Sequence, residues 1–537
     1  MPQKYRFWIN IICWPLLMTY CSDSIVIDEQ TVFRYNEYRN VTSLDPAFAR
    51  NPQNIWPINQ LFNGLVQLDS MLNIQPEIAK KWTISDDGMT YTFELRQDVF
   101  FHSSPLFGPQ QTRKVIAQDF VYSFNRLVDP EIASPGQWVL QQVKDYQALN
   151  DSLFQIKLKN PFPAFLGLLT MRYCAVVPHE AASKDTFRKK PIGTGPFYFK
   201  RWEENVKLVL RRNSNYFERD KQGHRLPYME AIAIQFIPDI QSEFMLFLQK
   251  KIDYINSIDA SYKDQLLQPE GSLREKYDSL FNMQKGPYLN TEYIGFNLEK
   301  KQSPIHDIRI RKAINIGFNR NNMIAYLRNN IGTPAKKGFI PKGLAGSSEV
   351  YFQYNPVEAR ALVAEYIKEH NRIPELRIAT DANYIDLCEF LQSELEKIGL
   401  KFQIDIMPTA SLREAKSNGN LELFRASWIA DYPDAENYLS LFYSKNFSPS
   451  GPNYTHYANA KFDQLFRLAI KTKNDSLRTS YYRQMDSLAL SEYPIVPLYY
   501  DEVVRFTQKN IKGLEMNPIN LLVLKRVQKG QKKTIPK

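Results

Sequence analysis

The chain has 537 residues, of which 44% are hydrophobic and 13% aromatic, and a formal net charge of +11. A single core stops growing near ~250–300 residues, so these values exclude a disordered chain and predict two or three lobes. Without the two basic residues of the N-terminal leader and the six of the tail 525–537, the net charge is +3, which argues against nucleic acid as a partner.

The N-terminus has the pattern of an export signal. Lys4 and Arg6 precede a mostly apolar stretch, residues 7–20, that is too short to span a membrane. Cys21 then begins a polar segment and resembles the lipidated first residue of bacterial lipoproteins, although Tyr20 stands where their signals favour a small residue. We expect residues 1–20 to be a signal peptide and Cys21 to carry lipid. A plain cleaved signal and an uncleaved anchor are the alternatives.

Period-two and helical patterns of apolar residues follow in the first half of the chain. They predict strands over 90–95, 197–199, 206–210 and 232–236, and helices over 117–127 and 241–250. The strands on either side of residues 203–205 are expected to form a hairpin.

A strand–helix–strand unit is predicted further on. Residues 376–379 have a strand pattern, 386–398 carry an apolar helical face ending before Gly399, and 402–406 alternate again. This spacing is typical of a βαβ crossover and therefore of a parallel sheet. Because no long low-complexity linker separates the predicted lobes, the domain edges should be short crossings.

The sequence gives little support for metal or catalytic chemistry. The six histidines are scattered singly, and there is no GxSxG elbow and no phosphate-binding loop. Cys174 and Cys388 could form one disulfide in an oxidising compartment, although two buried free thiols are favoured. We therefore predict no cofactor, no metal and no enzymatic activity.

The run 428–434 places Asp431 among a Trp, a Tyr and a Pro. Such a carboxylate is solvated, paired or awaiting a cationic ligand, because an unpaired buried charge costs several kcal/mol. Taken alone, a Trp-x-x-Asp motif is more often an ordinary surface loop.

Eight further segments change that assessment. They are SLDP at 43–46, LFNGL at 61–65, PEIAKKW at 76–82, TYTFELR at 90–96, AQDFVYSF at 117–124, GTGPF at 193–197, NSNYF at 213–217 and DIRIRKA at 307–313. In this order they resemble the extracytoplasmic solute-binding proteins that serve oligopeptide and dipeptide ABC permeases, the large three-domain type. The resemblance spans about residues 31–498.

The resemblance implies an α/β fold, the periplasmic-binding-protein type II clamshell, with two mixed-sheet lobes and a smaller inserted α/β domain. Transferred edges give lobe I as 24–56, 193–287 and 495–537, the insertion domain as 57–192, and lobe II as 288–494.

It also implies a ligand site. The acidic residue of the Trp-x-x-Asp motif, here Asp431, would pair with the α-ammonium of a peptide, and nearby main chain would bind the peptide as a strand does. The implied ligand-binding residues are Asp431, Trp428, Ile429, Ala430, Tyr432, Arg50, Asn51 and Trp138. Pro52 lacks an N–H, so one donor of the opposite lobe is missing, and Trp138 could equally pack in the core.

The function implied is a monomeric, lipid-anchored receptor on the periplasmic side of a bacterial membrane that passes short peptides to an ABC permease. One alternative is the same clamshell holding a metal chelate, haem, an opine or an oligosaccharide. A second is a periplasmic chaperone. An enzyme would need a catalytic set that the sequence does not contain.

Overall fold

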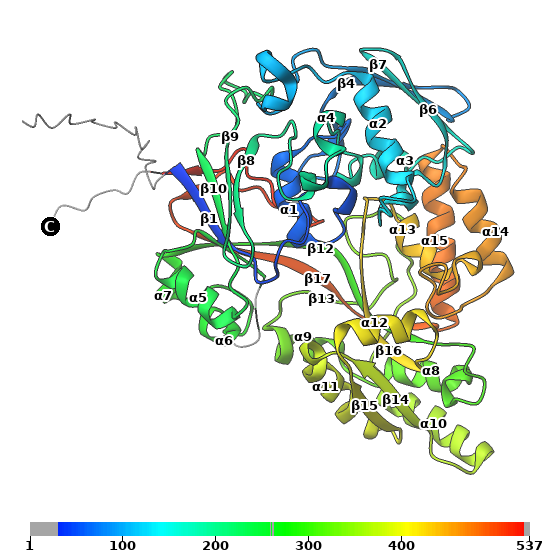
Figure 1. Ribbon diagram of the computed structural model, residues 1–537. Helices are drawn as coiled ribbons and strands as arrows, with labels where there is room; N and C mark the ends of the chain where they lie inside the picture. The colour runs from blue at the N-terminus through cyan, green and yellow to red at the C-terminus, as the bar shows by residue number, and fades with distance from the viewer. Residues whose placement is uncertain (1–30, 258, 260–261, 531–537) are drawn as a thin grey trace, which may run out of the picture.

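The computed structural model describes residues 31–257, 259 and 262–530 (Figure 1). The predicted signal peptide and Cys21 lie outside the described residues, as does the end of the basic tail. In the described part of the chain, no helix has both the length and the apolar character that a membrane crossing requires.

One mixed sheet of eleven strands runs through most of the molecule. Its order is β15-β14-β16-β12-β17-β11-β1-β10-β9-β8, with β13 paired to β17. The strands are β1 (Val32–Asn36), β8 (Phe197–Glu203), β9 (Lys207–Arg212), β10 (Ala231–Gln235), β11 (Tyr254–Asn256), β12 (Phe281–Phe296), β13 (Thr333–Pro334), β14 (Glu375–Thr380), β15 (Lys401–Ile406), β16 (Leu423–Ile429) and β17 (Ile495–Gln508). The predicted strand 232–236 is confirmed as β10, and the predicted hairpin as the antiparallel pair β8 and β9.

The long strands β12 and β17 join the two lobes into this one sheet. They pair antiparallel, and their register shifts between Pro287 and Thr291 (Figure 1). In the first part of β17, Leu498 packs in a core made of lobe II residues. Further along the same strand, Val504 packs with lobe I residues between 244 and 281. We therefore propose that the second crossing between the lobes lies within β17, near residues 500–503, a few residues after the transferred edge.

The predicted βαβ unit of lobe II is confirmed. Strands β14 and β15 are parallel neighbours, and α11 (Ile385–Glu396) connects them. Leu387, Leu391 and Leu395 are buried, and Gly399 has a left-handed φ of +96° at the turn that follows. The other helices of this lobe are α8 (Ile308–Ile316), α9 (Arg320–Arg328), α10 (Pro356–His370), α12 (Thr409–Ser417), α13 (Glu436–Leu439), α14 (Ala460–Ala469) and α15 (Asp475–Ser491).

The insertion domain has an antiparallel sheet of its own, in the order β4-β5-β7-β6. The predicted strand 90–95 and helix 117–127 are confirmed as β5 and α2, and α2 packs on β6 and β7 through Phe120 and Phe124. The elements are β2 (Val66–Leu68), β3 (Ile74–Pro76), β4 (Ala79–Ile84), β5 (Thr90–Leu95), α2 (Ala117–Val128), β6 (Val143–Asn150), β7 (Leu153–Leu158), α3 (Phe165–Leu168) and α4 (His179–Ala182).

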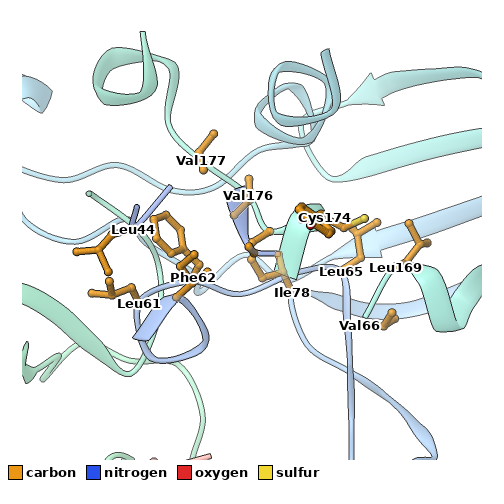
Figure 2. Close-up of a cluster of buried hydrophobic side chains, with 14 of the residues drawn as sticks. Leu44, Leu61, Phe62, Leu65, Val66, Ile78, Leu169, Cys174, Val176 and Val177 are labelled. Carbon is orange, nitrogen blue, oxygen red and sulfur yellow. The ribbon is translucent and has the colours of Figure 1, made fainter. Parts of the chain in front are cut away.

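The insertion domain shares a continuous apolar core with lobe I. Figure 2 shows Leu44 of lobe I in the same cluster as Leu61, at the end of α1 (Pro52–Leu61), and as Ile78 and Cys174 of the insertion domain. The remaining small elements of lobe I are α5 (Ile240–Leu248), which confirms the predicted helix 241–250, α6 (Lys263–Leu266), α7 (Glu275–Asp278), β18 (Ile511–Lys512) and β19 (Gln528–Lys529). Cys174 and Cys388 are both buried and free, as favoured from the sequence.

Two of the family-like motifs have structural roles at this junction. Asp45 of the SLDP segment forms a buried ion pair with Arg126 of α2, at 2.7 Å between Oδ2 and Nη2. Gly195 lies so close to α1 that a Cβ there would be 2.4 Å from the Gln60 carbonyl oxygen, and its N–H donates to the Leu61 carbonyl at 2.9 Å. The glycine-rich segment therefore permits close backbone packing.

Candidate ligand site

The Trp-x-x-Asp run lies where β16 leaves the main sheet. The Ala430 N–H donates to the Leu289 carbonyl at 2.9 Å, which extends the ladder with β12. Because successive residues of a strand face opposite edges, the N–H and C=O of Ile429 point away from β12. On that far edge β14 pairs with β16 at Leu423 and Phe424, near its start. Within the described residues, the C-terminal end of β16 therefore has one edge without a strand partner. In the run 428–430, the backbone N–H and C=O of Ile429 face this open edge.

Asp431 is a carboxylate that reaches solvent and is nevertheless surrounded by protein. Its side chain is exposed, yet desolvation raises the pKa of its carboxyl to about 6, an effect partly offset by a hydrogen bond from the Asn437 amide. Among the described residues, no Lys, Arg or His forms an ion pair with it. A partly desolvated carboxylate without a cation favours a cationic ligand.

The other carboxylates of the same loop have partners. Asp434 accepts a hydrogen bond from the Tyr482 hydroxyl at 2.8 Å and lies 3.2 Å from Nη1 of Arg478. Glu436 is buried, accepts a hydrogen bond from the Tyr432 hydroxyl, and has its pKa raised to about 7 by burial. These two groups are occupied in holding the loop, which distinguishes Asp431 from both.

Asn437, which the sequence reasoning missed, fixes the geometry of the run. This residue is buried on α13, and its Oδ1 accepts hydrogen bonds from Trp428 Nε1 at 2.9 Å and from the Asp431 N–H at 3.3 Å. One amide therefore orients both the indole and the carboxylate. The only local signal is an Asn six residues after the motif in a segment of aromatic and apolar residues, which is not specific.

The ligand-binding residues predicted outside lobe II lie in two different places. At the start of α1, three consecutive residues are exposed: Arg50, Asn51 and Pro52. Pro52 is in the first turn of the helix, where a backbone N–H would have no acceptor within the helix, so its missing N–H costs the helix nothing. Trp138 is 39% exposed on a short turn of the insertion domain. Within the described residues, no hydrogen bond or ion pair joins Asn51 or Trp138 to Asp431.

The charges of Arg50 and Asp431 act on one hydroxyl, that of Tyr173 of the insertion domain. Burial raises the pKa of the Tyr173 hydroxyl, the negative charge of Asp431 raises it further, and the positive charge of Arg50 lowers it. The loop also rests on the insertion domain, since a Cβ added at Gly167 of α3 would be 3.4 Å from Cβ of Tyr432. Tyr432 is buried in the core shared by lobe I and the insertion domain.

Within residues 31–257, 259 and 262–530, no three His, Cys, Asp or Glu side chains are grouped to hold a metal ion. A Ser–His–Glu arrangement occurs in lobe II, with Ser448 Oγ 2.9 Å from His456 Nε2 and His456 Nδ1 2.9 Å from Glu299 Oε1. Ser448 is 6% exposed and the His456 ring stacks on Phe447, which is the geometry of a packed loop and not of a hydroxyl open to substrate.

Known proteins of one family resemble this chain over most of its length. The model of bacterial extracellular solute-binding proteins, family 5 Middle, matches residues 73–450. A probable di/tripeptide-binding protein of Pseudomonas aeruginosa is 26% identical over 496 residues, covering 87% of this chain and 89% of the relative. Heme-binding protein A of Haemophilus influenzae is 27% identical, with coverage of 86% and 85%.

Among solved structures, the periplasmic binding protein DppA of Helicobacter pylori, in complex with the peptide STSA, superposes with a TM-score of 0.78. The two chains are 23% identical, and the match covers 93% of this chain and 98% of that one. This likeness confirms the expected fold, the α/β clamshell of periplasmic binding proteins.

Proposed function

Because the chain belongs to the bacterial extracellular solute-binding proteins of family 5, we propose that it is a receptor for short peptides. One observation supports this most strongly: Asp431 is exposed and partly desolvated, and it has no cation partner within the described residues. Every ordinary peptide carries one α-ammonium, so this carboxylate can recognise peptides of varied sequence by their common cation.

The open edge of β16 suits the same ligand. An extended peptide could pair with the outward N–H and C=O of Ile429, as added strands do, and this contact does not depend on side chains. The ion pair with Asp431 would then fix the position of the peptide's N-terminus along this edge. Such a pair is strong enough to do so, since removing one partner of a desolvated pair costs about 2–5 kcal/mol.

We extend the proposal to the cell envelope. The receptor is anchored on the periplasmic side of the membrane through lipid on Cys21 and delivers its peptide to the transmembrane subunits of an ABC permease. It acts as a monomer and breaks no bond in its ligand. The residues that would carry the signal and the lipid precede the described part of the chain.

A non-peptide solute is the second candidate. A relative named for haem binding covers most of this chain at an identity similar to that of the di/tripeptide-binding relative. Haem, however, has no ammonium group for Asp431, so a carboxylate without an ion-pair partner in the described part of the chain favours a ligand with an amine.

Mass spectrometry of the small molecules released by denaturing the purified protein tests the proposal. A mixture of short peptides that is absent from Asp431→Asn protein supports the peptide function and its anchor. A single non-peptide solute, equally retained by Asp431→Asn, would contradict both. Glu365→Gln is a matched control, since Glu365 is an exposed carboxylate on α10 of lobe II, outside the loop, and this variant should retain the wild-type set of peptides.

A further inference from the structure

The turn that follows α9 is attached to lobe I, although the helix itself packs in lobe II. Met323 and Ile324 of α9 are buried in a core of lobe II residues. Ile331, a few residues further on, is 4% exposed and lies in the core of lobe I that contains Phe244 and Phe281. The chain therefore leaves the packing of lobe II and enters that of lobe I between Ile324 and Ile331.

Hydrogen bonds fix the same turn to α6 of lobe I and to the loop after it (Figure 1). Asn329 is buried, its Nδ2 donates to Asp264 Oδ1 at 2.9 Å, and its Oδ1 accepts from Lys263 Nζ at 2.8 Å. Asn330 Nδ2 donates to the Pro269 carbonyl at 2.9 Å. The turn cannot move relative to lobe I without breaking these bonds and exposing its apolar side chain.

The sequence of the turn suits this close connection. Asn329, Asn330 and Gly332 have left-handed φ angles of 47°, 57° and 101°, a conformation that asparagine and glycine adopt more readily than other residues. The Asn329 carbonyl oxygen lies so near lobe I that a Cβ added at Gly271 would be 2.7 Å from it. The turn and lobe I are therefore in close backbone contact.

Strand β17 has few strand partners where it crosses between the lobes. On one edge, its pairing with β12 is interrupted between Pro287 and Thr291. On the other edge, β13 pairs with Tyr500 and β11 with Arg505, and no strand of the described residues pairs with β17 between these two positions. A strand without its ladder bends more easily, so the lobes can rotate at these few residues.

The end of α9 and the turn after it occupy this gap. Arg328 Nη2 lies 2.5 Å from Asp501 Oδ1, and the Gly332 N–H donates to Glu502 Oε2 at 2.8 Å. Two neighbouring residues of the crossing strand are thus held by single groups of this segment in place of a strand. The segment that packs in the core of lobe I therefore also binds the strand at which the lobes rotate.

We propose that residues 329–332 are a third hinge connection, which moves with lobe I while α9 and β13 on either side of it move with lobe II. Two neighbouring strands whose ladder is interrupted can twist as well as bend. A third attachment, on the edge of β17 away from β12, restricts the lobes to rotation about one axis. The turn thereby limits how far the empty protein opens, through contacts that are not part of the Asp431 loop.

Asn329→Gly tests the proposal, because glycine keeps the left-handed backbone and removes the side-chain hydrogen bonds to lobe I. Spin labels at two exposed positions, Met245→Cys on α5 of lobe I and Ile406→Cys on β15 of lobe II, report the distance between the lobes in the empty protein. Loss of the attachment should broaden the distribution of this distance and shift it to longer values. An unchanged distribution would overturn the proposal.

Asn371→Gly is the matched control. Asn371 also ends a helix of lobe II, α10, in a left-handed conformation with a φ of 49°, and its side chain is exposed. This variant should give the wild-type distribution, and equal broadening in both glycine variants would overturn the proposal. Ile331→Ala, which removes the apolar anchor in lobe I, should broaden the distribution as Asn329→Gly does, and a melting curve shows whether each labelled protein is folded.

Ligand affinity is a second readout, and it rests on the peptide-binding function proposed above. An empty protein that opens wider populates the binding-competent form less, so trialanine should bind several-fold more weakly to Asn329→Gly than to wild type. Weaker binding without a change in the distances would be a local effect on the fold and would overturn the proposal. If wild type does not bind trialanine, the peptide function is wrong, and the distances in the empty protein still decide the role of the turn.

Discussion

Peptide affinity should depend on pH through Asp431. Burial raises the pKa of this carboxyl to about 6 in the empty protein, and only its ionised form pairs with an ammonium. A peptide amine has a pKa of about 8, so the ligand remains a cation throughout the range in which Asp431 titrates. Affinity should therefore be highest between about pH 6 and 8 and fall on both sides.

The size of the acid effect follows from competition between one proton and one ligand. Below the pKa of Asp431, the dissociation constant should rise about tenfold for each pH unit, so binding at pH 5 should be about tenfold weaker than at pH 7. Titration calorimetry of trialanine across this range measures the slope directly. In Asp431→Asn the affinity should be weak and independent of pH between 5 and 7. A flat wild-type profile, or the same slope in both proteins, would refute the assignment.

Three other changes have defined outcomes. The pKa of Asp431 is higher in the fold than its ordinary 3.8, so the stability associated with its protonated form is fully present below pH 3.8 and is lost as pH rises through 6. Asp431→Asn should therefore raise the Tm of the empty protein at pH 7.5 and raise it much less at pH 4.5. Glu292→Gln leaves Arg425, its buried ion-pair partner, without a counter-charge and should lower the free energy of unfolding by about 3–5 kcal/mol in urea titration; unchanged stability would contradict the pairing. Gly195→Ala should lower the Tm clearly because its Cβ meets backbone at 2.4 Å, whereas Gly64→Ala, with contacts no closer than 3.5 Å, should not.

Local patterns predicted the local structure well. The βαβ unit at β14–α11–β15 and the hairpin β8–β9 each depend on residues close in the chain, so apolar periodicity and turn residues were sufficient. The same patterns could not show that β12 and β17 pass through both lobes. Their pairing joins residues two hundred or more positions apart, and a strand shared by two lobes has no local signature.

The candidate site was only partly accessible from sequence. Asp431 could be singled out because a charge among aromatic residues requires a reason. The main-chain roles could not be assigned, since sheet register turns Ala430 toward β12 and leaves Ile429 on the open edge. Asn437 was missed because what makes it relevant is its position in three dimensions: its side-chain oxygen accepts hydrogen bonds from two groups of the motif.

The most direct test of the central claim is to compare one tripeptide with its N-acetylated form in calorimetric titrations of the wild-type protein. The two ligands have the same side chains and carboxylate and differ at the ammonium that Asp431 is proposed to bind. The free peptide should bind at least 30-fold more tightly, which is the lower end of the effect of an unmatched charge. Equal affinities would contradict it.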